Sequence, residues 1–312
     1  MRDSLRSRAM NHKFHYDTPK QALRWLRVHE SLSPVRTDHD CERIYNAAMA
    51  DCAARMSSES EVEVISLGCG GGQKDALLIR HLIGSVANLQ LRYAPVDVSA
   101  GLAIIARSAA IEAGVAPDSI TPMCIDLAES SNWKSALSPI LTTRKRIVCF
   151  FGMLPNFVSN EVMPQLGSIL RDGDFLLLSA NLAPGNDYHA GVINSLPLYD
   201  NELTRDWLWS VLLDIGVEKN AGEMMFSIVP CPNGNDLLRI ESRVVFNREC
   251  RVEFGGESFI FGVGDSVRLF FSYRHTPARL ATLLATQQII IQESWINKNG
   301  DEGVFLCRRT GN

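Results

Sequence analysis

Short apolar runs alternate with longer helical patterns between residues 62 and 182. The run Val62–Leu67 reads VEVISL, breaks at once into GCGGG and continues into the helical pattern KDALLIRHLIGSV. Further apolar runs cover residues 89–99, 119–127, 146–157 and 174–182, and helical patterns separate them. Strands that alternate with helices in this way predict a parallel, doubly wound α/β sheet, whose ligands bind beyond the carboxyl ends of the strands.

The pattern changes after residue 182. A tryptophan-bearing helical stretch, DNELTRDWLWSVLLDIG, leads into alternating strand patterns that include LLRIESRVVF, CRVEF, SFIFG and VRLFFSYR. A parallel sheet has no place for such strands, so they predict an inserted antiparallel subdomain. After it, residues 276–287 form a predicted last helix, and the turn signal NKNGDEG predicts a closing hairpin.

These elements predict the α/β fold class and divide the chain into four parts. The Rossmann-like sheet begins in the second part and is completed by the fourth. The predicted parts are an N-terminal helical segment that contributes to the substrate domain (1–57), a Rossmann-like cofactor domain (58–182), an inserted α+β substrate-binding subdomain (183–275), and the last helix with the hairpin (276–312).

Charge and composition narrow the expected partners. The chain has 31 Lys and Arg against 35 Asp and Glu without a dense basic run, so we expect no nucleic-acid partner. Because there is no long apolar span and no apolar signal core, we expect a cytoplasmic protein that does not bind membranes. We also expect a monomer or homodimer. The eight cysteines form no CxxC pair, and neither they nor the seven histidines cluster, so we expect no structural metal.

The glycine turn after the first strand is the first chemical signal. Glycines at the start of a helix let the backbone approach a ligand closely, so Gly68 and Gly70, with the two glycines that follow, fit a nucleotide-like cofactor. The dinucleotide fingerprint requires a third glycine where this chain has Gln73, which disfavours a pyrophosphate. The pattern therefore favours a cofactor without phosphates.

Two carboxylates follow at successive strand ends. Asp97 ends the second strand, where a carboxylate can accept hydrogen bonds from ribose hydroxyls. Asp126 ends the third strand and is placed to accept from an adenine amino group, although a helix-capping role is the alternative. Lys74 is a candidate partner for a cofactor carboxylate, and a solvated helix lysine is the alternative.

The motifs VISLGCGGGQKDALL, YAPVDVSAGL, CIDL and FFGMLPNF together resemble the histidine N-alpha-methyltransferase family of ergothioneine biosynthesis, which includes the fungal dimethylallyltryptophan N-methyltransferases. The resemblance extends to HYDTPKQALRWLRVHESLSPVRTD upstream and to GDSVRLFFSYRH downstream. It implies that S-adenosylmethionine (SAM) is the cofactor. It also implies that six residues bind SAM, and we add Gly70 and Ser99 from the same two motifs. The predicted cofactor-binding residues are therefore Tyr16, Gly68, Gly70, Lys74, Asp97, Ser99, Asp126 and Leu127.

The same resemblance implies a set of substrate positions. Asn156 and Tyr188 are the predicted catalytic residues, because they would orient the acceptor group. The predicted substrate-binding residues are Ser33, Gly152, Asn156, Tyr188, Phe270 and Ser272.

Several of these positions depart from the family pattern. Members that act on histidine have a glutamate two positions before the serine, where this chain has Phe270. An unpaired substrate N–H costs roughly 1–3 kcal/mol, so imidazole specificity should fall about ten- to a hundredfold. Ser33 stands in place of a tyrosine, and Gly152 lies one residue closer to Asn156 than is usual. We therefore expect a small amine or amino acid other than histidine, unless Phe270 is only a strand core residue.

The expected reaction needs positioning more than proton transfer. A sulfonium already activates its methyl group, so the protein has to place a neutral amine in line with it. Alternative hypotheses are O-methyl or aminocarboxypropyl transfer from SAM, and a non-catalytic SAM-binding homologue. A nicotinamide dehydrogenase is disfavoured by Gln73 and by the second carboxylate, Asp126.

Overall fold

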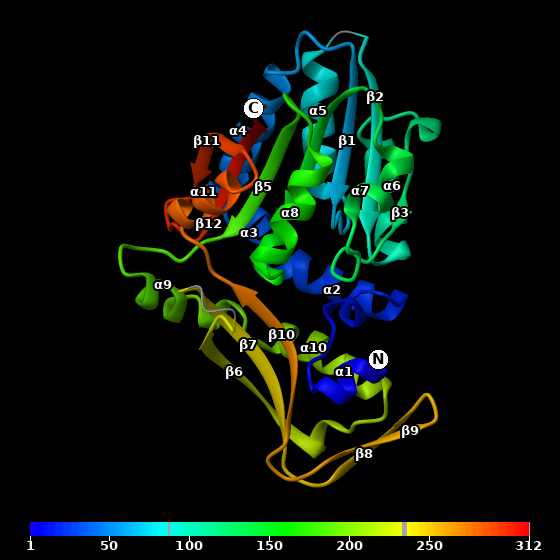
Figure 1. Ribbon diagram of the computed structural model, residues 1–312, viewed down its shortest axis with the longest axis vertical. Coiled ribbons are helices and arrows are strands. Elements are labelled where there is room, and N and C mark those ends of the chain that lie inside the picture. The colour runs from blue at the N-terminus through cyan, green and yellow to red at the C-terminus, as the bar shows by residue number, and fades with distance from the viewer. Residues whose placement is uncertain (87, 233–235, 312) are drawn as a thin grey trace. The chain divides into compact units, whose positions relative to one another are not determined.

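The computed structural model of the protein describes residues 1–86, 88–232 and 236–311 (Figure 1). Its chain divides into two compact units. The three-stranded unit comprises Met1–Ser31 and Ala183–Arg274, and the seven-stranded unit comprises Leu32–Leu182 and His275–Asn312. The predicted N-terminal segment, 1–57, is thus shared between both units.

A mostly parallel sheet forms the centre of the seven-stranded unit. Its strand order is β11-β12-β5-β4-β1-β2-β3, and β1 to β5 pair in parallel, whereas the closing hairpin of β11 and β12 is antiparallel. The strands are β1 (Glu61–Leu67), β2 (Gln90–Asp97), β3 (Met123–Cys124), β4 (Lys145–Phe151), β5 (Phe175–Asn181), β11 (Ile289–Ile296) and β12 (Glu302–Arg309).

Helices cover both faces of this sheet (Figure 1). The α-helices are α3 (Pro34–Thr37), α4 (His39–Ala54), α5 (Gln73–Ser85), α6 (Ala100–Glu112), α7 (Trp133–Ala136), α8 (Ser159–Ile169) and α11 (Pro277–Ala285). Short 3-10 turns are η2 (Pro117–Ser119), η3 (Ser138–Ile140) and η4 (Leu154–Asn156).

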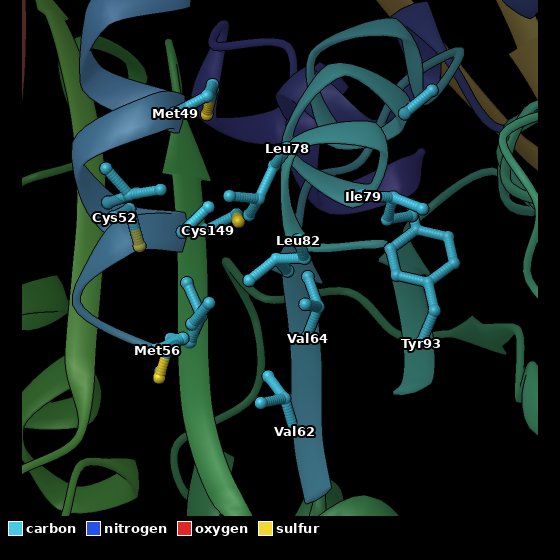
Figure 2. Close-up of a cluster of buried hydrophobic side chains, with 14 of the residues drawn as sticks. Met49, Cys52, Met56, Val62, Val64, Leu78, Ile79, Leu82, Tyr93 and Cys149 are labelled. Carbon is cyan, nitrogen blue, oxygen red and sulfur yellow. The ribbon is translucent and has the colours of Figure 1, made fainter. Parts of the chain in front are cut away.

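Alternate strand residues supply two cores, one on each face. Val64 and Cys149 pack with α4 and α5, as Figure 2 shows, whereas their neighbours Ile65 and Phe150 pack with α7, α8 and α11. Strands buried on both faces need continuous apolar runs, which explains the run IVCFF in β4. This arrangement confirms the predicted doubly wound, Rossmann-like α/β fold.

The three-stranded unit contains a separate antiparallel sheet with the order β10-β7-β6 and a two-stranded sheet of β8 and β9. Its strands are β6 (Gly222–Pro230), β7 (Leu238–Phe246), β8 (Cys250–Phe254), β9 (Glu257–Phe261) and β10 (Ser266–Tyr273). Its helical elements are α1 (Arg2–Ser7), η1 (His12–His15), α2 (Pro19–Leu32), α9 (Tyr188–Asn194), η5 (Leu196–Leu198), α10 (Glu202–Asp214) and η6 (Lys219–Ala221).

The N-terminal segment covers the free edge of β10. Ala9 forms a parallel bridge with Arg268, whose N–H donates to Arg8 O and whose carbonyl accepts from Met10 N. An uncovered edge strand exposes unpaired backbone groups, so this bridge removes a site for unwanted strand pairing. Helix α10 packs its Trp207 and Leu208 into the same core as β7 and β10.

Most predicted elements are present, with two differences. The third strand is only two residues long, because its sequence turns polar at Asp126. Strand β6 was not predicted, since GEMMFSIVP alternates weakly and ends in a proline that suits an edge position. Within the described residues, no helix is long and apolar enough to cross a membrane, and no group of three or more metal-ligand side chains is found.

Candidate cofactor and acceptor sites

The glycine turn lies between β1 and α5 in the seven-stranded unit. Gly68, Gly70 and Gly72 all have positive φ, at 70°, 52° and 75°. A Cβ on Gly72 would lie 2.7 Å from the Ala106 backbone, and one on Gly68 would lie 2.2 Å from the Met153 sulfur. Only glycine meets both the conformation and the space here, so the turn lets the backbone approach a ligand closely.

Asp97, at the end of β2, braces that turn. Its Oδ2 accepts from Gly70 N at 3.0 Å and its Oδ1 from Ser99 N at 2.9 Å. The carboxyl is almost fully buried, and burial raises the pKa of Asp97 to about 6 against the lowering effect of these N–H groups. A carboxylate can accept about four hydrogen bonds, so Asp97 retains capacity for ribose hydroxyls.

The other predicted residues at these strand ends also have structural partners. Ser99 caps α6, since its side chain accepts from Leu102 N. Asp126 Oδ1 accepts from the N–H groups of Ala128 and Glu129, at 3.0 and 3.2 Å, and so stabilises the turn at residues 127–129, where no helix begins. Leu127 lies in the core of its sheet face. The adenine role of Asp126 stays a prediction.

Lys74 lies in the first turn of α5. Its ammonium donates to the Tyr45 hydroxyl at 2.8 Å and lies 4.5 Å from the centre of the Tyr45 ring. It also lies 5.9 Å from the Phe151 ring centre. Burial lowers the pKa of Lys74, and Glu302 opposes that shift. The ammonium is therefore held in place and is not a mobile surface charge.

The loop after β4 adjoins the glycine turn, because Met153 packs against Gly68. Gly152 has φ 67° and donates from its N–H to Ser179, while Asn156 ends η4. The seven-stranded unit therefore brings the Gly152–Asn156 segment beside the predicted cofactor turn.

Ser33 lies in a different part of the seven-stranded unit, at the start of α3. It is buried, and its carbonyl accepts from the N–H groups of Arg36 and Thr37, so its described role is to begin that helix.

The remaining predicted substrate residues belong to the three-stranded unit. Phe270 is buried, and its ring stacks on His12 at 5.2 Å and lies 6.0 Å from both Tyr199 and Trp207. Ser272 is 1% exposed, and its hydroxyl lies 2.8 Å from the Tyr199 hydroxyl. Phe270 and Ser272 are thus enclosed by aromatic side chains of their own unit.

Two predicted tyrosines of this unit also have partners there. The Tyr188 hydroxyl accepts from Leu238 N at 2.8 Å and donates to Arg274 O at 3.0 Å, so it links β7 to the residue after β10. The Tyr16 ring lies 5.8 Å from Trp25 and 5.5 Å from Trp207. The described contacts of Tyr188 are therefore with the sheet backbone, and those of Tyr16 are with aromatic rings.

A family model described as "Histidine-specific methyltransferase, SAM-dependent" matches residues 34–191. The chain belongs to this family. It is a SAM-dependent methyltransferase with a SAM-methyltransferase fold, and SAM is its cofactor. The match confirms the family, the enzyme class and the cofactor that the sequence motifs implied. It leaves the acceptor and the individual site residues as predictions.

Solved methyltransferase structures are similar at low identity. The magnesium protoporphyrin IX methyltransferase ChlM of Synechocystis, with bound S-adenosylhomocysteine, is 14% identical, with 96% of this chain and 97% of that chain covered and a TM-score of 0.49. The 1,6-didemethyltoxoflavin-N1-methyltransferase of Burkholderia thailandensis is 13% identical, with 94% and 89% covered and a TM-score of 0.42. No curated protein matches this sequence.

The residues of this methyltransferase fit a SAM molecule on three grounds. The glycine turn has no room for side chains, Asp97 has acceptor capacity, and the half-buried Lys74 ammonium has one described hydrogen-bond partner although it carries three N–H donors. A hydroxyl-bearing sugar and a carboxylate are the groups that such acceptors and donors bind.

Sequence reasoning missed several residues of these regions. Tyr45 and Glu302 hold Lys74, and Tyr199 and Trp207 surround Phe270. The sequence offered a signal only for Trp207, through the aromatic helix that bears it. The others become neighbours only when distant elements pack together.

Proposed function

We propose that this methyltransferase transfers the methyl group of SAM to the nitrogen of a small amine or amino acid other than histidine. The observation that carries the proposal is the setting of Phe270. The rings of His12, Tyr199 and Trp207 surround it, and none of these four side chains is a carboxylate. An imidazole N–H placed against Phe270 would lose its hydrogen bond to water without a replacement, at a cost of roughly 1–3 kcal/mol.

In this proposal the seven-stranded unit binds the cofactor. Asp97 accepts from the ribose hydroxyls, the glycine turn contributes close backbone contact, and Lys74 pairs with the carboxylate. When bound, SAM supplies a methyl group that is already activated by the sulfonium. The chain therefore has to hold the two reactants in line, which alone lowers a barrier by several kcal/mol.

Asn156 is the residue we assign to orienting the acceptor nitrogen. Its amide offers both a donor and an acceptor, and it lies on the loop beside the glycine turn. Tyr188 is the second candidate, although its hydroxyl already bonds two backbone groups. No histidine base is required, because a nearby positive charge and desolvation both favour the neutral amine.

A screen of amino acids and small amines with SAM tests the proposal, with mass spectrometry to detect methylated products. We expect methylation of an amine, weaker or no methylation of histidine, and much less product with Asp97→Ala at the same SAM concentration. Fragmentation of the product identifies the methylated atom. Histidine as the best acceptor would overturn the specificity, an oxygen-methylated or aminocarboxypropylated product would overturn the reaction, and SAM binding without any product would favour a non-catalytic homologue.

A further inference from the structure

Tyr45 and Glu302 form a buried chain of hydrogen bonds that ends at Lys74. The Tyr45 side chain is fully buried on α4, and its hydroxyl lies 2.5 Å from Glu302 Oε1 and 2.8 Å from Lys74 Nζ. Glu302 is itself buried, at the start of β12. Three elements that are distant in sequence therefore meet at one ammonium group.

The direction of this chain is set by chemistry. An ammonium can only donate, so the Tyr45 oxygen accepts from Lys74. The single proton of the Tyr45 hydroxyl is then available to Glu302. Burial, and next the Glu302 charge, raise the pKa of Tyr45 well above its usual value, so the hydroxyl keeps this proton.

The same chain favours the charged form of Lys74. Burial lowers the pKa of Lys74, while Glu302 raises it. The Tyr45 ring, 4.5 Å from the ammonium, adds a favourable cation–π contact. Among the described residues, Tyr45 accepts the one hydrogen bond that Lys74 makes, so two of its three N–H groups remain for a ligand.

We propose that Tyr45 and Glu302 are positioning residues, which orient the Lys74 ammonium and maintain its charge so that its two remaining N–H groups bind the carboxylate of SAM. This inference rests on the cofactor role proposed for Lys74. Neither Tyr45 nor Glu302 touches the cofactor in this proposal; both act through Lys74. Their fixed places on α4 and β12 hold the lysine in one rotamer before the cofactor arrives.

Calorimetric binding of two ligands to the full chain tests the proposal. S-adenosylhomocysteine carries the carboxylate, whereas 5′-methylthioadenosine has the same adenosine and sulfur but lacks the aminocarboxypropyl tail. We expect Tyr45→Phe to weaken S-adenosylhomocysteine about tenfold and to leave methylthioadenosine within about twofold. A merely structural defect would weaken both ligands alike, and that outcome overturns the proposal.

Tyr93→Phe is the matched control. Tyr93 is equally buried in the same core and donates to a buried carboxylate, Asp75 Oδ2, at 2.7 Å, but it does not contact Lys74. Like Tyr45→Phe, the variant Tyr93→Phe removes one buried tyrosine hydroxyl, at a comparable cost in stability. We expect it to leave the ratio of the two affinities unchanged.

Glu302→Gln provides a second variant in case Tyr45→Phe does not fold. It keeps the shape but removes the charge that opposes deprotonation of Lys74, so we expect the alkaline loss of S-adenosylhomocysteine binding to begin at a lower pH than in the wild type. An unshifted pH profile with a wild-type ligand ratio overturns the inference. If Lys74→Met also binds both ligands like the wild type, the proposed role of Lys74 itself fails. If Lys74→Met selectively weakens S-adenosylhomocysteine while both other variants match Tyr93→Phe, only the positioning role fails.

Discussion

The predicted cofactor region and the predicted acceptor region differ in how far their polar groups are already satisfied. Among the described residues, Asp97 accepts backbone N–H groups on both oxygens and Lys74 uses one of its three donors, so both retain capacity. In the acceptor region, the Ser272 hydroxyl lies against Tyr199, and the Tyr188 hydroxyl bonds two backbone groups. One region is prepared for a ligand, whereas the other is occupied by its own side chains.

This difference has an energetic consequence. A ligand that meets unused donors and acceptors gains hydrogen bonds without breaking any in the protein. A ligand that uses Ser272 has to compete with Tyr199 for the same hydroxyl, so a hydrogen bond gained there is offset by weakening one within the protein. We therefore expect cofactor affinity to depend on single polar groups, and acceptor affinity to depend more on apolar and ring contacts.

Phe270→Glu tests the comparison with the largest expected effect. If Phe270 belongs to the aromatic cluster of Trp207, Tyr199 and His12, a carboxylate there is buried without a partner. We expect the free energy of unfolding in urea to fall by about 3 kcal/mol, against about 1.5 kcal/mol for the control Phe270→Leu. A stable glutamate variant with improved histidine turnover would instead place position 270 in an acceptor pocket that rejects imidazole.

Asp97→Ala probes the cofactor region. It removes the acceptor for Gly70 N and Ser99 N as well as the capacity proposed for the ribose hydroxyls. We expect S-adenosylhomocysteine to bind about a hundredfold more weakly, which equals about 2.7 kcal/mol. Asp97→Asn keeps the shape of the side chain and one acceptor oxygen, so its affinity for S-adenosylhomocysteine should lie between those of the wild type and Asp97→Ala. Unchanged affinity in Asp97→Ala would contradict the cofactor assignment.

The parts of the molecule that could be predicted from sequence are those set by neighbouring residues. The strand, glycine turn and helix around Gly68 are local, and their conformational demands are visible in the residue types. Asp97 could be assigned because a strand end fixes where its side chain emerges. The closing hairpin followed from its turn residues in the same way.

The remainder depends on packing between distant segments. Glu302 reaches Tyr45 across 257 positions, and no local pattern marks either residue. For Phe270, strand alternation identifies a buried side, but it cannot distinguish a pocket wall from a core position. That decision is made by Trp207 and Tyr199, whose contacts with β10 exist only in the folded unit.

Acid should affect the two regions in opposite directions. His15, in the three-stranded unit, is fully buried, and burial lowers its pKa from 6.5 to about 4, although the Leu269 carbonyl favours the charged form. Between these values the unfolded chain binds the proton and the folded chain does not, so His15 costs stability as the pH falls from about 6.5 to about 4. For Asp97, whose pKa is raised from 3.8 to about 6, the folded state binds the proton more tightly, so acidification in that range is stabilising.

His15→Gln isolates the contribution of His15 to the pH dependence of stability. A shift of this size is worth roughly 2 kcal/mol at pH 5, so the variant should lose that much less stability than the wild type between pH 7.5 and pH 5 in urea unfolding. His39→Gln is the control, because it makes the same substitution at a histidine whose side chain is fully exposed. An identical slope for His15→Gln would show that His15 is accessible to protons in the folded state.

The smallest expected effect tests whether the Ser272 hydroxyl binds the acceptor or only stabilises the three-stranded unit. Tyr199→Phe removes the hydroxyl that lies 2.8 Å from Ser272 Oγ and leaves that buried group without this partner, at about 1 kcal/mol of stability. Combining Tyr199→Phe with Ser272→Ala removes both hydroxyls, so the double variant should recover most of the lost stability.

The KM for the acceptor tests whether Ser272 also binds the substrate. If Ser272 bonds the acceptor during turnover, freeing it from Tyr199 lowers KM and Ser272→Ala raises it. Equal KM values in all three variants would mean that the polar groups around Phe270 are satisfied by the chain itself, and that acceptor choice depends on the shape of the aromatic cluster.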